Sequence, residues 1–331
     1  DAYTRIAARF IGKHIPGTPT VIVQNMPGAS SLQFVRYLQD QAPKDGTQFG
    51  MFNRGLMPKS VLEPKETGVD FTKFAWIGSM NSELAICYMW GTTGIGYNVN
   101  KIKERMPDAP LDSWSMVFDP AIISKFKDCG VMFLDAPDEV IPAALNYLGK
   151  NPNSRAPEDF AAAEELLKKV RPFVKKFHSS EYINALANGD ACLVIGWSGD
   201  IKQAASRAEE KNKTQKDPKK KVEIGYIIPK EGAGTFYDNL TIPKDAKNID
   251  EAYAFIDYLL RPEVIAKASN AISYANGNID SQAFIDKAIL EDRSVFPDEA
   301  TMKKLFTVLP ITDQKVQREA TRIWRDIKRK Q

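Results

Sequence analysis

The sequence predicts an α/β protein made of two lobes joined by two crossing strands. Its 331 residues, 43% of them hydrophobic, are enough for two compact cores rather than one. Short apolar and β-branched runs alternate with amphipathic helical segments along the chain. Two long extended segments, near residues 84–98 and 222–242, can each cross between lobes. We therefore expect residues 1–91 and 230–331 in lobe 1, and residues 92–229 in lobe 2.

The first hundred residues begin the alternation of helices and strands. Apolar residues recur at helical spacing in TRIAARFIGKHI (4–15) and SLQFVRYLQDQA (31–42). Short strands are expected in PTVIV, QFGMFN and FAWIGSM, and the first of them runs into the Pro-Gly turn of NMPGASS. ELAICYMWGTTGIGYNV then forms the first crossing strand.

The middle of the chain continues this pattern. GVMFLD (130–135) is expected as a strand, followed by a helix that APDEV opens. EDFAAAEELLKKVRPFVKKF (158–177) is the clearest helix, and SSEYINALANGD (179–190) is a shorter one that ends at its glycine. ACLVIG is a buried strand, and the chain after Asp250 is mostly helical. KNKTQKDPKKK (211–221) is interpreted as a solvated basic loop, because no aromatic or Gly-rich partner accompanies its charges.

Charge and composition argue against a nucleic-acid-binding protein and against a membrane-spanning one. The 45 basic and 42 acidic residues leave a net charge of +3, which argues against a protein that depends on nucleic-acid phosphates. No run reaches the roughly 18 apolar residues that a membrane span requires. The chain begins with Asp1 rather than Met, which fits a processed product from which an export signal has been removed.

Cysteine and histidine usage argues against a metal centre. Cys87, Cys129 and Cys192 show no CxxC spacing, and the two histidines, His14 and His178, are far apart. A zinc site or a Cys-His dyad is therefore not expected, and the sequence implies neither a metal nor a cofactor. In an oxidising compartment, three cysteines fit one structural disulfide and one remaining thiol.

Rings and carboxylates recur together where strands end, which is where ligands sit in α/β sheets. A primary ammonium needs negative charge at hydrogen-bonding distance, and a methylene chain packs on aromatic faces. Together these groups suit a diamine or polyamine. The alternative for each residue alone is structural: the rings cover cores, and the acids, such as the Asp of IGWSGD, cap helices. The residues concerned are Asp135, Asp138, Glu139, Trp197, Asp200, Phe236, Tyr237, Asp238 and Tyr274.

Seven segments carry a more specific signal. They are YMWGTTGIGYN, CGVMFLDAPDEV, NYLGKNPNS, FHSSEYINALANGD, IGWSGD, IPKEGAG and LLRPEV. Over about residues 88–331 the chain resembles the periplasmic putrescine- and spermidine-binding proteins of bacterial ABC importers. The resemblance implies a two-lobed, type II periplasmic binding protein that closes on a polyamine.

The same resemblance implies roles for individual residues. Trp197 would stack on the ligand, Asp200 would hold an amine, and Cys129 and Cys192 would form a disulfide that leaves Cys87 free. The complete set of implied ligand-binding residues is Glu139, Ser179, Trp197, Asp200, Phe236, Asp238 and Tyr274.

Residues 1–87 resemble a different family. DAYTRIAARFIGKHIPG, VIVQNMPGASS, QAPKDGTQFGMFNRG and FAWIGSMNSE are similar to receptors of tripartite tricarboxylate transporters. The chain is therefore interpreted as a splice, and ligand contacts from its first part cannot be carried over. In the receptor family, the turn of NMPGASS would form a carboxylate cradle.

The favoured function is a periplasmic solute-binding protein that captures putrescine or spermidine in the cleft between its lobes. It would act as a monomer, deliver its ligand to the membrane permease of an ABC importer, and bind no nucleic acid. The alternative is a receptor for a di- or tricarboxylate, for which Glu139, Asp200 and Asp238 have the wrong sign of charge. An enzyme is not expected, since no activated nucleophile or phosphate loop accompanies the acids. A scaffold that only keeps the fold is a further alternative.

Overall fold

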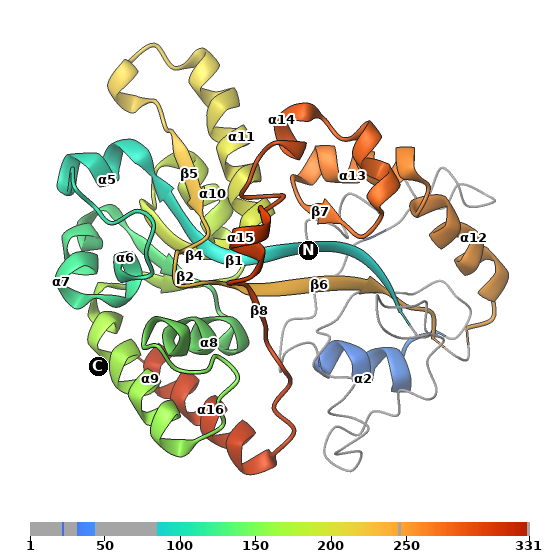
Figure 1. Cartoon of the computed structure of the whole chain (residues 1–331), viewed down its shortest axis with the longest axis horizontal. Coiled ribbons are helices and arrows are strands. Elements are labelled where there is room, and N and C mark those ends of the chain that lie inside the picture. The colour runs from blue at the N-terminus through green and yellow to red at the C-terminus, as the bar shows by residue number, and fades with distance from the viewer. Residues whose placement is uncertain (1–21, 23–31, 44–84, 244–245, 330–331) are drawn as a thin grey trace. The chain divides into compact units, whose positions relative to one another are not determined.

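The computed structural model describes residues 22, 32–43, 85–243 and 246–329 (Figure 1). The helix expected over residues 4–15 and the strands expected in PTVIV, QFGMFN and FAWIGSM lie outside the described residues, except for Ile22.

The chain divides into two compact units, and each contains more than one segment. The smaller unit comprises residues 1–90 and 237–287, and the larger unit comprises residues 91–236 and 288–331. The chain passes from one unit to the other within strand β1 (Ile86–Asn98) and within strand β6 (Gly234–Leu240), as the two crossing strands predicted. It passes a third time after Lys287, which the sequence analysis did not anticipate.

The larger unit is built on a mixed sheet. Besides parts of β1 and β6, its strands are β2 (Val131–Phe133), β3 (Lys176–Phe177), β4 (Leu193–Trp197), β5 (Ile224–Ile227) and β8 (Phe306–Thr307). Strand β2 is parallel to β3 and β4, and β4 pairs antiparallel with β1 from Thr93↔Trp197 to Tyr97↔Leu193. Strand β5 pairs with β1 antiparallel, and β8 with β6 parallel.

Helices cover both faces of this sheet. The helices are α5 (Val99–Arg105), α6 (Ser115–Phe118), α7 (Pro120–Ile123), α8 (Pro137–Tyr147), α9 (Pro157–Val170), α10 (Glu181–Asn188), α11 (Ser198–Thr214), α15 (Glu299–Met302) and α16 (Gln314–Lys328). Figure 1 shows α10 and α11 on one side, and α8, α9 and α16 on the other. Leu193, Val194 and Ile195 of β4 are fully buried, because a strand covered on both faces needs a continuous apolar run.

The smaller unit contains α2 (Leu32–Asp40), α12 (Ile249–Leu259), α13 (Pro262–Ile272) and β7 (Ala275–Asn276), and the short α14 (Lys287–Leu290) begins at its last residue. Strand β7 pairs antiparallel with the first part of β1. The Asn276 side chain donates to Ser269 Oγ over 2.9 Å and accepts from Ser281 Oγ over 3.0 Å, so its buried amide is hydrogen-bonded within the unit.

Two local predictions change in the structure. The helix expected over 158–177 ends at Val170, since Pro172 lacks the N–H that would continue it, and residues 171–173 form a short 3-10 turn. The basic stretch 211–221 begins as helix, because α11 continues to Thr214. The helix ending at Gly189 is confirmed: this residue has φ 79°, and its N–H donates to carbonyls of the last turn.

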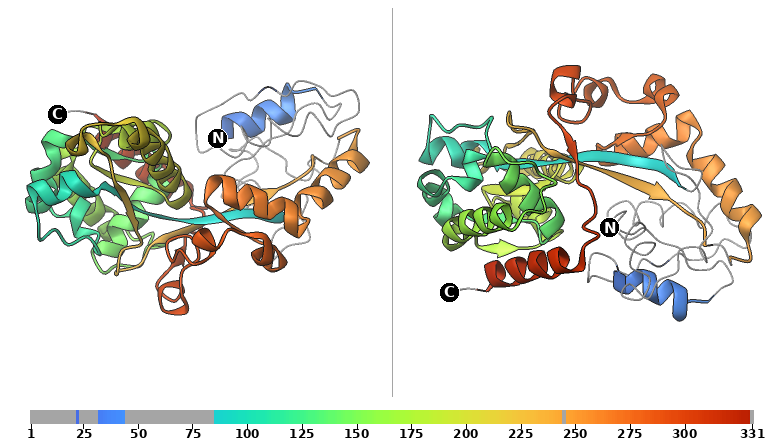
Figure 2. Two further views of the ribbon diagram at one scale, coloured as in Figure 1. Left: turned by 90° about the horizontal axis from the view of Figure 1, so that it is seen from above. Right: turned by 60° about the horizontal axis from the view of Figure 1, so that its bottom comes forward.

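The C-terminal segment packs with the larger unit, whereas the expected division gave it to lobe 1. Helix α16 buries Ile323, Trp324 and Ile327 and lies along α9 (Figure 2). Arg322 of α16 donates to both carboxylate oxygens of Glu164 on α9, over 2.7 and 3.2 Å. The amphipathic pattern of α16 is visible in the sequence, but its packing partner is not.

Candidate functional site

The ring and the acid of IGWSGD lie at the corner where strand β4 ends and helix α11 begins. Trp197 occupies the position before the first helical residue, and Asp200 lies in the first turn of α11. Asp200 therefore does not cap the helix as the structural alternative expected. Its charge is favourable in this turn, where the helix dipole is positive. The Asp200 residue is 6% exposed, and the Trp197 residue is half-buried.

The Tyr182 hydroxyl forms hydrogen bonds with both Asp200 and Trp197. Tyr182, on α10, is fully buried. Its Oη donates to Asp200 Oδ2 over 2.8 Å and accepts from the backbone N–H of Trp197 over 3.2 Å. The glycine before Trp197 makes room for this phenol, since a Cβ on Gly196 would lie 2.7 Å from Tyr182 Cε2.

Glu139 lies in the first turn of α8, which Pro137 begins. Its Oε2 accepts a hydrogen bond from Thr93 Oγ1 over 2.5 Å. Thr93 belongs to β1 and is buried, so a rigid strand holds the hydroxyl that contacts this acid.

A second set of hydroxyls links β1 to its neighbours. Tyr226 Oη donates to the carbonyl of Thr92 over 2.9 Å and lies 2.7 Å from Thr92 Oγ1. The Thr92 N–H donates to Ser198 Oγ over 3.3 Å. Burial raises the pKa of the Tyr226 phenol, and the charge of Glu139 raises it further. Tyr226 therefore stays neutral and keeps its proton for hydrogen bonding.

Two predicted aromatic residues meet in the larger unit. The rings of Trp197 and Phe236 have centroids 6.2 Å apart with planes at 69°, an edge-to-face arrangement. Both residues are half-buried.

Ser179 and Asp135 have structural contacts within the larger unit. Ser179 Oγ accepts from the backbone N–H of Asp135 over 3.1 Å. The Asp135 carboxylate accepts from Trp324 Nε1 over 2.8 Å and from Lys328 Nζ over 2.7 Å. Asp135 therefore anchors α16 and does not cap a helix, which differs from both the ligand-binding and the capping expectation.

The remaining predicted residues, Asp238 and Tyr274, belong to the smaller unit. Tyr274 is 1% exposed, whereas Asp238 is half-buried on β6. Burial and the nearby Asp238 carboxylate raise the pKa of Cys87 and of Tyr88 to about 12. Both groups are therefore neutral beside this acid. In the same unit, the rings of Trp90 and Tyr237 stack at 6.2 Å.

The structure thus brings five of the seven predicted site residues into one unit. Within it, Trp197 lies beside Phe236 and is linked to Asp200 through Tyr182. Sequence reasoning missed the hydroxyl groups that hydrogen-bond to these side chains or to one another around them. The signal available for two of them was the Thr-Thr pair between glycines in an otherwise apolar crossing strand. The residues missed are Thr92, Thr93, Tyr182, Ser198 and Tyr226.

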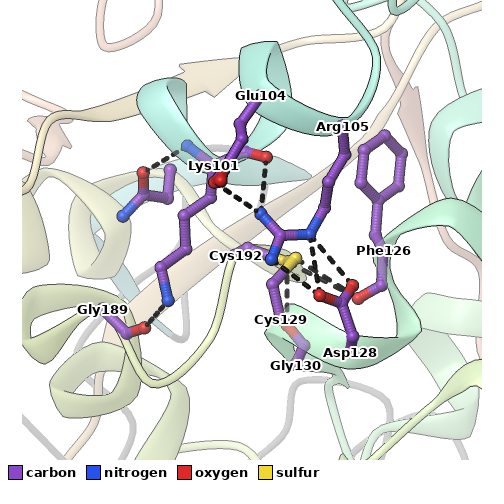
Figure 3. Close-up of a disulfide and its surroundings, with 10 residues drawn as sticks. Lys101, Glu104, Arg105, Phe126, Asp128, Cys129, Gly130, Gly189 and Cys192 are labelled. Atoms are coloured by element: carbon purple, nitrogen blue, oxygen red, sulfur yellow. Dashed lines mark hydrogen bonds and ion pairs between the residues drawn. A yellow bond between two sulfur atoms is a disulfide. The ribbon is translucent and has the colours of Figure 1, made fainter.

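The disulfide between Cys129 and Cys192 is confirmed, with Cα atoms 5.5 Å apart, and Cys87 is a buried free thiol (Figure 3). Beside the disulfide, Arg105 forms a bidentate pair with the exposed Asp128, in which Nε donates to Oδ1 over 2.9 Å and Nη2 to Oδ2 over 2.7 Å. Lys101, on the same helix as Arg105, donates to the carbonyl of Gly189 over 2.6 Å.

Two classes of feature are absent from the described part of the chain. No cluster of three or more His, Cys, Asp or Glu side chains there is arranged to hold a metal ion. Among the helices of the described residues, none is long and apolar enough to cross a membrane.

Comparison with known proteins identifies relatives. The chain is 49% identical over 253 residues to the putrescine-binding periplasmic protein SpuD of Pseudomonas aeruginosa, an alignment that covers 76% of this chain and 67% of that protein. It is 47% identical over 250 residues to the putrescine-binding periplasmic protein PotF of Escherichia coli, which covers 75% of this chain and 65% of that protein. The alignments thus span about two thirds of the length of these relatives.

A solved structure resembles the whole fold. A chain from Listeria monocytogenes, assigned to a spermidine/putrescine ABC transporter, superposes with a TM-score of 0.71 at 25% identity and covers 98% of this chain and 95% of its own. Together with the passages of the chain through β1 and β6, this confirms the predicted type II periplasmic binding protein fold.

The family match covers most of the chain. Residues 56–297 match the bacterial extracellular solute-binding proteins. The match begins within residues 1–87, the part for which the sequence analysis predicts a resemblance to receptors of tripartite tricarboxylate transporters. The chain belongs to the family of bacterial extracellular solute-binding proteins.

Proposed function

We propose that this protein captures a polyamine, putrescine or spermidine, in the periplasm and delivers it to the membrane permease of an ABC importer. The observation that carries the proposal is the corner in which Trp197 and Phe236 lie edge to face while Asp200 is held at the start of α11. An ammonium is attracted to both the carboxylate and the ring face, and its methylenes pack on the rings.

The other predicted site residues have roles of the same kind in this proposal. Glu139, held by Thr93, supplies a second acid from the larger unit, and Ser179 supplies a polar contact. Asp238 and Tyr274 supply an acid and a ring from the smaller unit. The names of the relatives, which are putrescine-binding periplasmic proteins, support a polyamine as the ligand.

A receptor for a di- or tricarboxylate is the weaker proposal. Asp200 and Glu139 would repel such an anion, because two like charges at short range raise the cost of keeping both ionised. The relatives are binding proteins, so we propose a monomeric carrier without catalytic activity and without a nucleic-acid partner.

A thermal-shift screen with putrescine, cadaverine, spermidine, succinate and citrate tests this proposal. A ligand that binds the folded state stabilises it by about 2.7 kcal/mol at one hundred times its dissociation constant. We expect the diamines and spermidine to raise the melting temperature and the carboxylates to leave it unchanged. The Asp200→Asn variant should lose most of the shift, whereas Ser113→Ala, which removes a hydroxyl bonded to Glu231, should keep it. Stabilisation by citrate but not by putrescine would reverse the assignment.

A further inference from the structure

Two acids of the larger unit are each held by a hydroxyl group on a different, buried element. Tyr182 Oη donates to Asp200 Oδ2 over 2.8 Å, and Thr93 Oγ1 donates to Glu139 Oε2 over 2.5 Å. Tyr182 is 0% exposed and Thr93 is 1% exposed, so neither donor can move freely. The two contacts come from an α-helix and from the long strand β1.

The neutrality of these donors matters for a site that receives a cation. A hydroxyl fixes the direction of a carboxylate but leaves its net charge at −1. A lysine or arginine would fix it equally well but would compete with an ammonium ligand for the same charge.

Tyr182 also fixes the ring of the same corner. The phenol that donates to Asp200 accepts the backbone N–H of Trp197, so a single oxygen sets the distance between the stacking residue and the acid. The packing around it is tight, because a Cβ on Gly196 would overlap the Tyr182 ring at 2.7 Å.

We propose that Tyr182 and Thr93 are positioning residues, which orient the carboxylates of Asp200 and Glu139 for the ammonium groups of a polyamine. This inference rests on the proposed function. Neither residue needs to touch the ligand. Each removes the conformational freedom that an acidic side chain would otherwise lose on binding.

The test uses variants that delete only the hydroxyl. Calorimetric titration with putrescine should give an affinity about 3- to 10-fold weaker for Tyr182→Phe and for Thr93→Val, which corresponds to ordering one side chain. Thr93→Ser keeps the hydroxyl and should restore wild-type affinity. Ser113→Ala is the matched control, because the buried Ser113 hydroxyl donates to Glu231, a carboxylate outside the predicted set. Its affinity should be unchanged.

A second measurement does not depend on the ligand. Carbon-13 NMR of the ligand-free protein, labelled at carboxyl carbons, reports the pKa of each acid. Loss of a hydrogen bond to the ionised form raises a carboxyl pKa, so Asp200 should titrate higher in Tyr182→Phe and Glu139 higher in Thr93→Val.

The two measurements separate failure of this inference from failure of the proposed function. Wild-type affinity in both hydroxyl-deleting variants would overturn the positioning role, as would unchanged carboxyl titrations. If no polyamine binds the wild-type protein, the proposed function fails, and with it the role toward a polyamine.

Discussion

The disulfide should contribute strongly to the stability of the larger unit. Cys129 and Cys192 are separated by 63 residues, and the loop they close contains β2, α8, α9 and α10. This loop carries Glu139, Ser179 and Tyr182. The chain-entropy relation for a closed loop of this length gives about 4 kcal/mol of stabilisation, because the cross-link restricts the unfolded chain.

The double variant Cys129→Ala/Cys192→Ala tests this magnitude. Urea unfolding without reductant, followed by tryptophan fluorescence, should give a free energy of unfolding lower by about 4 kcal/mol than that of the wild-type protein. The signal reports mainly on the larger unit, which holds Trp114, Trp197 and Trp324.

The control for this variant is Cys87→Ala, which removes a buried thiol of the smaller unit without breaking a cross-link. It should lose far less stability than the double variant. A loss below about 1 kcal/mol in the double variant would refute the calculation, because it would mean that the 63-residue loop is already restricted in the unfolded chain.

Three further predictions concern packing, ligand selectivity and pH. Gly196→Ala places a Cβ 2.7 Å from the Tyr182 ring and should cost about 1 to 3 kcal/mol of stability in urea unfolding; unchanged stability would contradict the tight packing. Trp197→Ala should weaken putrescine binding by about 3- to 30-fold in calorimetry and change the putrescine-to-spermidine affinity ratio, whereas an unaltered ratio would argue against stacking. Glu164→Gln should destabilise the protein by about 1 to 2 kcal/mol near neutral pH. Hydrogen bonding from Arg322 lowers the Glu164 pKa below 4.5, so this contribution is full above that value and is lost as the pH falls through the folded-state pKa. If Glu164→Gln lowered the free energy of unfolding by the same amount at every pH, that result would contradict the ion pair.

Features encoded by local sequence were predicted well. The strands GVMFLD and CLVIG are continuous apolar runs, and the structure covers them on both faces. Gly189 ends α10 because it takes the left-handed conformation that other residues avoid. Trp197 is the last residue of β4 and Asp200 lies in the first turn of α11, so a short motif was enough to place them at one corner.

Features that depend on distant contacts were missed. Tyr182 lies on a helix whose sequence reads as ordinary amphipathic helix, and only the packing of α10 against α11 brings its hydroxyl to Asp200. Thr93 lies on β1 and Glu139 on α8, 46 residues later in the sequence, so their hydrogen bond forms only when the chain folds. The packing of the C-terminal segment was missed for the same reason, since the sequence of α16 does not specify Glu164 as the partner of Arg322.

We propose that the acids and rings of the predicted site hold a molecule that is positively charged at its ends. Calorimetric titration of the wild-type protein with putrescine, repeated with Asp200→Asn and Asp238→Asn, tests it most directly. We predict saturable binding by the wild-type protein and a large loss of affinity in both variants, with little change in unfolding. Equal affinity in all three proteins would contradict the claim.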